Sequence, residues 1–302
     1  MHVRSSPHLI RGLALSVLLA LALQPLRAQN IGASGRVVEQ HDFSDAEGKL
    51  LGYYSAVVVF SPTGSRVEAR PWSVDLGVEL SYVPRLSPDQ RSAGRTKLES
   101  TNLVPVFPRP RLALWLPGGL QLEGSSTPPI KVFAVKAQLY ALALSAPVTS
   151  VEGVELALRV SYVGGRVSGA ITCYHELAQG DVSRTEYWFH ICHARESDDR
   201  FEPSQWAGEL IGTLPKHYGA VVPYAGIGAQ RERTKFDVGV LTTDGARDLD
   251  HPILELRAIR EYGVAGLTWR VARRAHVSSE LFYAPGSVLT VRALASLDIH
   301  GR

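Results

Sequence analysis

The feature that most constrains this chain is a strict alternation of apolar and polar side chains between Gly153 and Val163. The apolar row is Val154, Leu156, Leu158, Val160 and Tyr162, interleaved with Glu155, Ala157, Arg159 and Ser161. A period of two predicts a β-strand with one apolar face and one polar face. A second copy occupies residues 74–83, where Val74, Leu76, Val78, Leu80 and Tyr82 form the apolar row. Both copies end in Ser-Tyr-Val, so they predict strands of the same kind.

Residues 1–28 have the pattern of a secretory signal peptide. Arg4 and Arg11 precede an apolar run, Leu13 to Leu23, and Ala28 supplies a small residue for cleavage. The run is shorter than the ~20 apolar residues that a membrane-spanning helix needs. Leu26 departs from the small residue usual at that place in a cleavage site. We therefore predict export, with cleavage near Ala28.

The charge balance argues against a nucleic-acid partner. The formal net charge is +3, and residues 1–28 carry three arginines and no acid, so residues 29–302 have a net charge of zero. No later stretch is apolar for long enough to predict a helical membrane span. An exported chain of alternating strands is then either a soluble all-β protein or an outer-membrane barrel.

Three features favour the barrel over a soluble sandwich. The alternating segments approach the ~9–11 residues that cross a bilayer at a tilt. Tyrosines and tryptophans recur near their ends, and short glycine-rich turns alternate with long polar loops. We predict an all-β fold, a transmembrane antiparallel up-and-down β-barrel of about 12 strands, within a range of about 10 to 14. Residues 71–302 would form the barrel, and residues 29–70 an N-terminal segment, either a first strand or a luminal hatch.

In this fold the apolar rows face lipid and the charged rows face the lumen. An aromatic girdle is predicted at Trp72, Tyr82, Tyr162, Tyr262 and Tyr283. The predicted lumen-lining residues are Asp75, Glu79, Lys136, Glu155, Arg159, Arg257, Arg270, Glu280, Arg292 and Asp298. These assignments place Ala137, Leu139 and Ala141, and likewise Leu254, Leu256 and Ala258, on the lipid side. Mixed signs favour a salt-bridge network that stiffens the wall, and a lining that orients a polar solute is the alternative.

Two cysteines lie in similar surroundings, TCYHEL and FHICHA. An antiparallel hairpin that pairs Cys173 with Cys192 also pairs His175 with His190. In an oxidising compartment we expect a disulfide between the two cysteines. The alternative is a zinc site that adds His175, His190 and His193 to the thiolates. The acidic loops 196–202 and 244–250 lack the spacing of a calcium loop, and no residue set predicts a cofactor.

The run Gly52 to Phe60, followed by Ser-Pro-Thr-Gly at 61–64, resembles the N-terminal hatch of the long-chain fatty-acid transporter family. In that family a small-residue segment leads into an Asn-Pro-Ala-Gly turn before the first barrel strand, and Ser61 and Thr63 depart from this motif. The resemblance implies a segment inside the lumen and uptake of hydrophobic compounds. The alternative is an ordinary first strand and turn. Farther on, the phrase PYAGIG at 223–228 resembles one common in outer-membrane barrels.

The sequence thus predicts an integral outer-membrane barrel, porin-like or with a structural surface role. A hydrophobic-compound uptake channel is the first alternative. A rim enzyme acting on lipid is the second, although no nucleophile motif accompanies His217, His251 or His276. The predicted partners are outer-membrane lipid and a small solute in the lumen.

Overall fold

The computed structural model describes residues 36–64, 71–85, 105–132, 135–178, 192, 195–214, 220–286 and 288–299. All of them belong to one compact unit, Ile31–Arg302. The predicted signal peptide lies outside the described residues. No described helix is long and apolar enough to cross a membrane.

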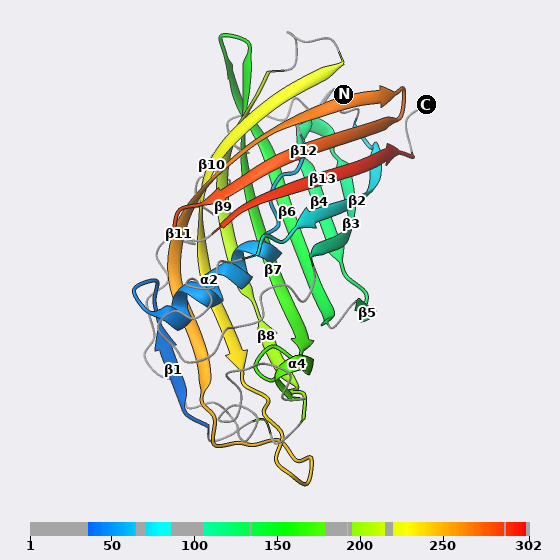
Figure 1. Ribbon diagram of the computed structural model, residues 1–302. Helices are drawn as coiled ribbons and strands as arrows, with labels where there is room; N and C mark the ends of the chain where they lie inside the picture. The colour runs from blue at the N-terminus through cyan, green and yellow to red at the C-terminus, as the bar shows by residue number, and fades with distance from the viewer. Residues whose placement is uncertain are drawn as a thin grey trace, which may run out of the picture. The chain divides into compact units, whose positions relative to one another are not determined.

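Ten strand positions close into an antiparallel barrel (Figure 1), which confirms the predicted fold class. Each wall strand pairs with the next along the chain, and β13 pairs with β2 to complete the ring. The wall strands are β2 (Val74–Tyr82), β3 (Val106–Trp115), β4 (Gln121–Ser126), β6 (Val135–Val151), β7 (Val154–Gly169), β9 (Ser204–Thr213), β10 (Val221–Asp237), β11 (Ile253–Ala272), β12 (Ala275–Ala284) and β13 (Val288–Asp298).

Three short strands complete the sheet. β8 (Asp199–Glu202) precedes β9 across Pro203 and fills the same position between β7 and β10. β1 (Val38–His41) runs parallel to the first residues of β11, and β5 (Lys131–Val132) forms a small hairpin with β6. β8 and β9 together occupy one of the ten positions in the ring. With the outside strands β1 and β5, the total is twelve, as predicted.

The predicted alternation sets the two faces of the wall. On β2, Leu76, Val78 and Leu80 are 45–51% exposed on the outside, whereas Glu79 and Ser81 are buried inside. Exposed apolar side chains of this kind come from every wall strand except β7, whose outward row is half-buried. A soluble monomer rarely exposes so much contiguous apolar surface. The outer face is therefore the lipid-facing surface of a transmembrane barrel.

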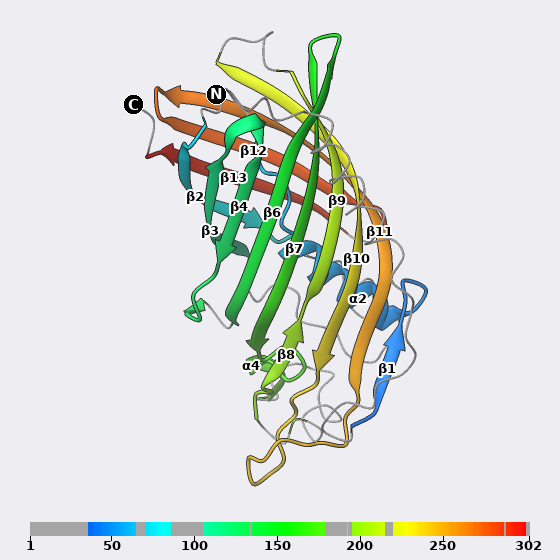
Figure 2. The same cartoon turned by 180° about the vertical axis from the view of Figure 1, so that it is seen from behind.

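The two ends of the barrel differ. At the turn end, β6 and β7 are joined by Glu152 and Gly153, both at positive φ, as a tight hairpin turn requires. The 3₁₀ turn η1 (Pro117–Gly119) and the turn after β11 lie at the same end. At the loop end, long connections leave β2, β7 and β10. The wall is also taller on one side (Figure 2), because β6, β7, β10 and β11 have 16–20 residues while β2, β12 and β13 have 9–11.

A helix fills the interior. Helix α2 (Ala46–Val58) follows β1 and buries Leu51, Tyr53 and Ala56 against inward side chains of the wall. Residues 59–64 continue from it as extended chain toward the turn end, and we call residues 46–64 the plug. The prediction of a first strand here is wrong. An apolar run that is buried on nearly every side has no period that separates strand from helix.

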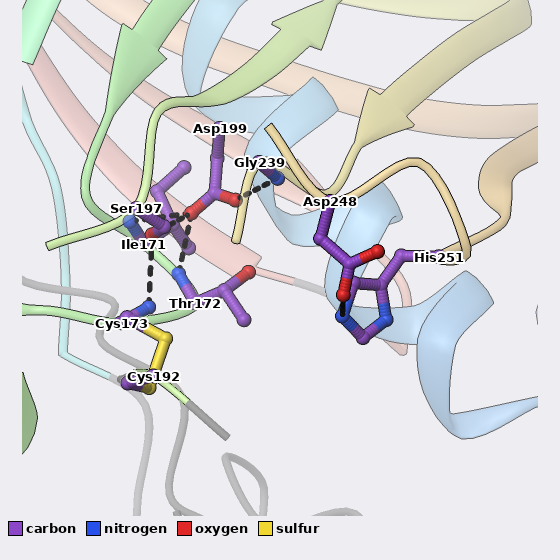
Figure 3. The surroundings of a disulfide bond; sticks show 9 residues. All are labelled: Ile171, Thr172, Cys173, Cys192, Ser197, Asp199, Gly239, Asp248 and His251. Atoms are coloured by element: carbon purple, nitrogen blue, oxygen red, sulfur yellow. Dashed lines mark hydrogen bonds and ion pairs between the residues drawn. A yellow bond between two sulfur atoms is a disulfide. The ribbon is translucent and has the colours of Figure 1, made fainter. Parts of the chain in front are cut away.

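At the loop end, a set of contacts around Asp199 joins the segment before β8 to the segment after β10 (Figure 3), and we call this set the clasp. The structure contains the expected disulfide between Cys173 and Cys192. The predicted hairpin around it is wrong in the described part, because Cys173 lies in a bend that leads into helix α4 (His175–Ala178). Residues 179–191 lie outside the described residues. Beside the disulfide, the buried carboxylate of Asp199 accepts four hydrogen bonds, from the backbone N–H groups of Ile171, Thr172 and Gly239 and the hydroxyl of Ser197.

We predict that Asp199→Ala loosens this clasp. The substitution removes the acceptor of three buried donors and of the half-buried Thr172 N–H, and each loss of a buried partner costs about 1–3 kcal/mol. Limited proteolysis in detergent should then cut the loops at 170–198 and 238–252 many times faster than in the wild-type protein. Asp198→Ala is the matched control, because the neighbouring Asp198 side chain is exposed and, among the described residues, bonds Arg200 alone. Equal cleavage of the two variants would contradict the assigned role.

Candidate functional site

Five buried arginines line the described part of the lumen and donate hydrogen bonds to the plug. Arg109 and Arg111 come from β3, and one each comes from β7, β11 and β13, as Arg159, Arg260 and Arg292. Their guanidinium groups donate eight hydrogen bonds of 2.8–3.5 Å to backbone carbonyls of the plug. The acceptors are Gly52, Ala56, Val58, Val59, Phe60 and Ser61.

Some of these hydrogen bonds satisfy the carbonyl groups at the C-terminal end of helix α2. The last four carbonyls of a helix have no partner within the helix, and they carry its negative dipole end. Here Arg292 donates to the Ala56 carbonyl, Arg109 to the Val58 carbonyl, and the Gln205 amide to the Ser55 carbonyl. Side chains of the wall therefore cap the helix, and the two capping cations come from β13 and β3, the strands on either side of β2.

Five buried glutamates balance the arginines, so the ten side chains form what we call the charged lining. Arg111 lies 2.9 Å from Glu79, and Arg159 lies 2.9 Å from Glu123 and 2.5 Å from Glu209. Arg260 pairs with Glu232. Glu280 faces Arg292 across the β12–β13 ladder, as Glu79 faces Arg109 across β2–β3. Because buried charges are stable only when paired, this balance is a structural requirement.

Phe60 is the apolar anchor of the plug. Its ring centroid lies 4.1 Å from the guanidinium of Arg111, 5.1 Å from that of Arg159 and 5.6 Å from that of Arg109, within cation–π range. The ring also packs against Ala141, Ala143 and Val163. The small inward side chains of β6 thus make room for the plug.

The Ser-Pro-Thr-Gly turn is fastened to Glu280. The hydroxyls of Ser61 and Thr63 donate to the Glu280 carboxylate, and so does the Tyr224 hydroxyl at 3.0 Å. Tyr224 also accepts the Gly64 N–H at 2.8 Å. Gly64 has φ of +126°, which favours glycine. The two residues that depart from the Asn-Pro-Ala-Gly motif are therefore those whose hydroxyls bind this carboxylate.

The plug divides the lumen into two unlike parts. On the turn side lies a polar cavity of about 70 Å³, with Thr63, Asp75, Trp115 and His276 among its lining residues. A cavity of this size holds a few water molecules. On the loop side, wall side chains pack around α2 as an apolar core that includes Phe107, Leu139, Phe201, Phe236, Leu256 and Phe282. Burial there raises the pKa of the Tyr53 phenol well above its ordinary value, and its hydroxyl donates to the Pro84 carbonyl.

The predicted lumen residues are placed as follows. Glu79, Arg159, Glu280 and Arg292 belong to the charged lining. On the inner side near the turn end, Asp75 and Asp298 are half-buried, whereas Arg270 and Glu155 are exposed near strand ends. Lys136 is a correction, because it lies on the exposed outer face of β6. Arg257 is a second correction, since it lies on the outer face of β11, where it pairs with Glu255 at 2.8 Å.

Both corrections have a physical cause. On β6 the inward residues are as apolar as the outward ones, because they contact the plug, so composition could not identify the lipid side. β11 is a single strand of 20 residues with one phase throughout, so Leu254, Leu256 and Ala258 face inward and not toward lipid as predicted. The single phase of β11 also places Tyr262 inside the barrel, where its hydroxyl donates to Glu209 at 2.6 Å. Tyr262 therefore does not belong to the aromatic girdle. Trp72, Tyr82 and Tyr283 are exposed, and the half-buried Tyr162 ring packs 4.7 Å from that of Trp206.

The sequence reading missed six members of the charged lining. The signal for two of them was present, since Pro108-Arg109-Pro110-Arg111 alternates along the chain. Proline usually indicates an edge strand or no strand. Here both prolines face outward on a wall strand. The other missed residues are Glu123, Glu209, Glu232 and Arg260.

The alternative of a zinc site can be compared with the described residues. They contain no group of three or more potential ligands from His, Cys, Asp and Glu. His175 bonds Glu196 at 2.7 Å in an exposed position, while His190 and His193 lie outside the described residues. In the acidic loop, the hydroxyl of Thr242 donates to Asp244 and holds the pKa of that carboxyl below its ordinary value.

The rim-enzyme hypothesis required a histidine bonded to a hydroxyl or carboxylate. Besides His175, His41 lies 3.3 Å from Asp45, and His251 lies 3.4 Å from Asp248 (Figure 3). Within the described part of the chain, no serine or threonine hydroxyl is hydrogen-bonded to any of these three histidines. A carboxylate–histidine pair without a nucleophile lacks the group that would attack a lipid ester.

We predict that Arg159→Met destabilises the barrel by about 3–5 kcal/mol, because Glu123 and Glu209 are left buried without their shared cation. Thermal unfolding in detergent, followed by circular dichroism, measures the loss. Arg166→Met is the matched control on the same strand. Arg166 faces outward and forms an exposed pair with Glu202, so its removal should leave the unfolding temperature nearly unchanged. An equal loss in both variants would show that the lining has no special role.

No family model matches the sequence, and a search of curated proteins finds no match. Among solved structures, Neisserial surface protein A aligns over 75% of this chain and 97% of its own, at 10% identity and a TM-score of 0.30. Omp33 of Acinetobacter baumannii aligns over 76% and 98%, at 7% identity and 0.30, and the Pseudomonas putida toluene transporter TodX over 78% and 69%, at 10% identity and 0.27. The closed wall with its apolar exterior itself gives this chain the fold of a bacterial outer-membrane β-barrel.

Proposed function

We propose that this protein is an integral outer-membrane barrel that its own plug closes at rest, with a structural or surface role. The observation that carries the proposal is the set of eight arginine–carbonyl hydrogen bonds that hold residues 52–61 inside the wall. A porin-like channel needs a continuous water-filled path. The turn-side cavity beside the plug has a volume of about 70 Å³, which holds only a few water molecules.

The energy of these bonds supports a closed resting state. A hydrogen bond to a charged group contributes about 1.5–3 kcal/mol. Stripping the arginines from the plug, without replacement donors, would therefore cost on the order of 10 kcal/mol. An open state at that cost is too sparsely populated to support steady diffusion.

We predict that the purified protein shows no steady current in a planar bilayer. To establish the position of the plug independently, Ser55→Cys and Thr234→Cys are combined, because the two hydroxyl oxygens lie 2.8 Å apart. The new cysteines should join in the oxidised protein, so that a maleimide labels neither after denaturation without reductant. Each single variant should label once. Steady single-channel current from the wild-type protein would overturn the closed barrel, and free thiols in the double variant would overturn the position of the plug.

A second candidate function is gated uptake of hydrophobic compounds. It is favoured by the loop side of the lumen, where Phe107, Phe236 and Phe282 surround α2 with apolar surface. Withdrawal of the helix would expose this surface to a hydrophobic guest. The charged lining on the turn side of the helix would then be the barrier that such a guest has to pass.

The tethered variant tests this function. In vesicles that contain the protein, a fluorescent long-chain fatty acid should enter faster than in empty vesicles. Oxidation of the Ser55→Cys/Thr234→Cys pair should stop the added uptake, and reduction should restore it. Uptake that is independent of the tether, or no uptake at all, would contradict gating by the plug and leave the structural role.

A further inference from the structure

The outer face of β10 changes from apolar to basic along its length. From the turn end its outward residues are Pro223, Ala225, Ile227 and Ala229, and then Arg231, Arg233 and Lys235. Ile227 is 70% exposed, as suits a side chain in lipid. At ~3.3 Å per residue, the three basic positions extend over about 13 Å toward the loop end. The change marks the boundary between hydrocarbon and headgroups.

The neighbouring strand continues this basic surface. Arg257 on β11 lies directly across from Arg233, and Glu255 lies across from Lys235. The Glu255 carboxylate is buried between the two guanidiniums, 2.7 Å from Arg233 and 2.8 Å from Arg257. Sharing one carboxylate holds both guanidiniums in place and leaves a net positive charge on the cluster.

The basic surface extends to the strands on the other side of β10. Arg166 on β7 and Arg200 on β8 also point outward at the loop end, together with Glu202. The basic patch consists of Arg166, Arg200, Arg231, Arg233, Lys235 and Arg257, with Glu202, Glu255 and Glu261 among them. At its loop-side edge Arg200 pairs with Asp198, and the outward Asp237 is balanced by Arg36 and Arg247. With these four residues counted, eight basic side chains stand against five acidic ones, so the surface has a positive excess.

Two members of the patch are not neutralised by neighbours. Arg231 and Lys235 form no ion pair within the described part of the chain, although Lys235 lies across from Glu202 and Glu255. Arg231 is exposed and Lys235 is half-buried. Both head groups thus remain available to an external anion.

We propose that the basic patch binds phosphate groups of anionic lipid headgroups in the leaflet that borders the loop end. The patch lies directly beyond the apolar band, at the depth where lipid phosphates lie. Guanidinium groups bind phosphate through two parallel hydrogen bonds, and the pair held by Glu255 is preorganised for such contacts. The inference rests on the membrane insertion proposed above, but it does not depend on whether the plug closes the lumen.

The test uses the full-length protein in nanodiscs of phosphatidylcholine with increasing phosphatidylglycerol, and lipid bound to the protein is measured by native mass spectrometry. Each basic charge near an anionic surface contributes about fivefold to lipid affinity. Arg231→Gln combined with Lys235→Gln should therefore weaken phosphatidylglycerol binding about 30-fold. Phosphatidylcholine binding should not change, and inorganic phosphate at millimolar concentration should not displace the bound lipid.

The matched control removes the same charge at the opposite end. Arg273 and Arg274 lie exposed in the turn between β11 and β12, so Arg273→Gln with Arg274→Gln should leave phosphatidylglycerol binding within about twofold of wild type. An equal loss in both double variants would reduce the effect to bulk electrostatics and overturn the proposal. Displacement by inorganic phosphate would identify an anion site without lipid specificity and would overturn it too. Failure to insert into pure phosphatidylcholine would instead contradict the membrane assignment.

Discussion

The structure depends on satisfying the polar backbone of a chain that runs through the middle of a barrel. Wall strands satisfy their own backbone by pairing with each other, but carbonyls such as those of Val58 and Phe60 have no strand beside them. Long arginines reach them from the wall, and the cost of burying these cations is offset by a glutamate from a neighbouring strand. The charged rows of the wall strands, the plug and the small polar cavity all follow from this requirement.

Much of the wall could be predicted from the sequence, because lipid on one side and charge on the other impose an alternation with a period of two. β2 follows this pattern throughout its length, and β7 follows it from Val154 to Tyr162. The prediction of phase was wrong on β6 and β11, where inward residues such as Leu139 and Leu256 are apolar because they contact the plug. A face that packs on an interior helix is chemically similar to one that faces lipid, and local pattern cannot distinguish them.

The candidate site was only partly predictable for a related reason. Arg159 and Arg292 were recognised as inward-facing, yet their role lies in contacts with residues 56–61, about one hundred or more positions away in the sequence. Arg109 and Arg111 were missed because their flanking prolines are typical of loops. The resemblance of Ser61–Gly64 to a hatch turn suggested an interior segment, whereas a purely local interpretation of Gly52–Phe60 suggested a strand. Only the closed ring brings these distant residues together.

The position of the plug in the chain also has a consequence for assembly. Phe60 is enclosed by three guanidiniums and by β6 and β7, and the ring closes where the last wall strand, β13, meets the first, β2. The contacts of the plug, which include those of Arg292 on β13, are therefore complete only when both ends of the sheet have met. We expect the plug to take its place while the sheet is still open, so that the wall strands close around it.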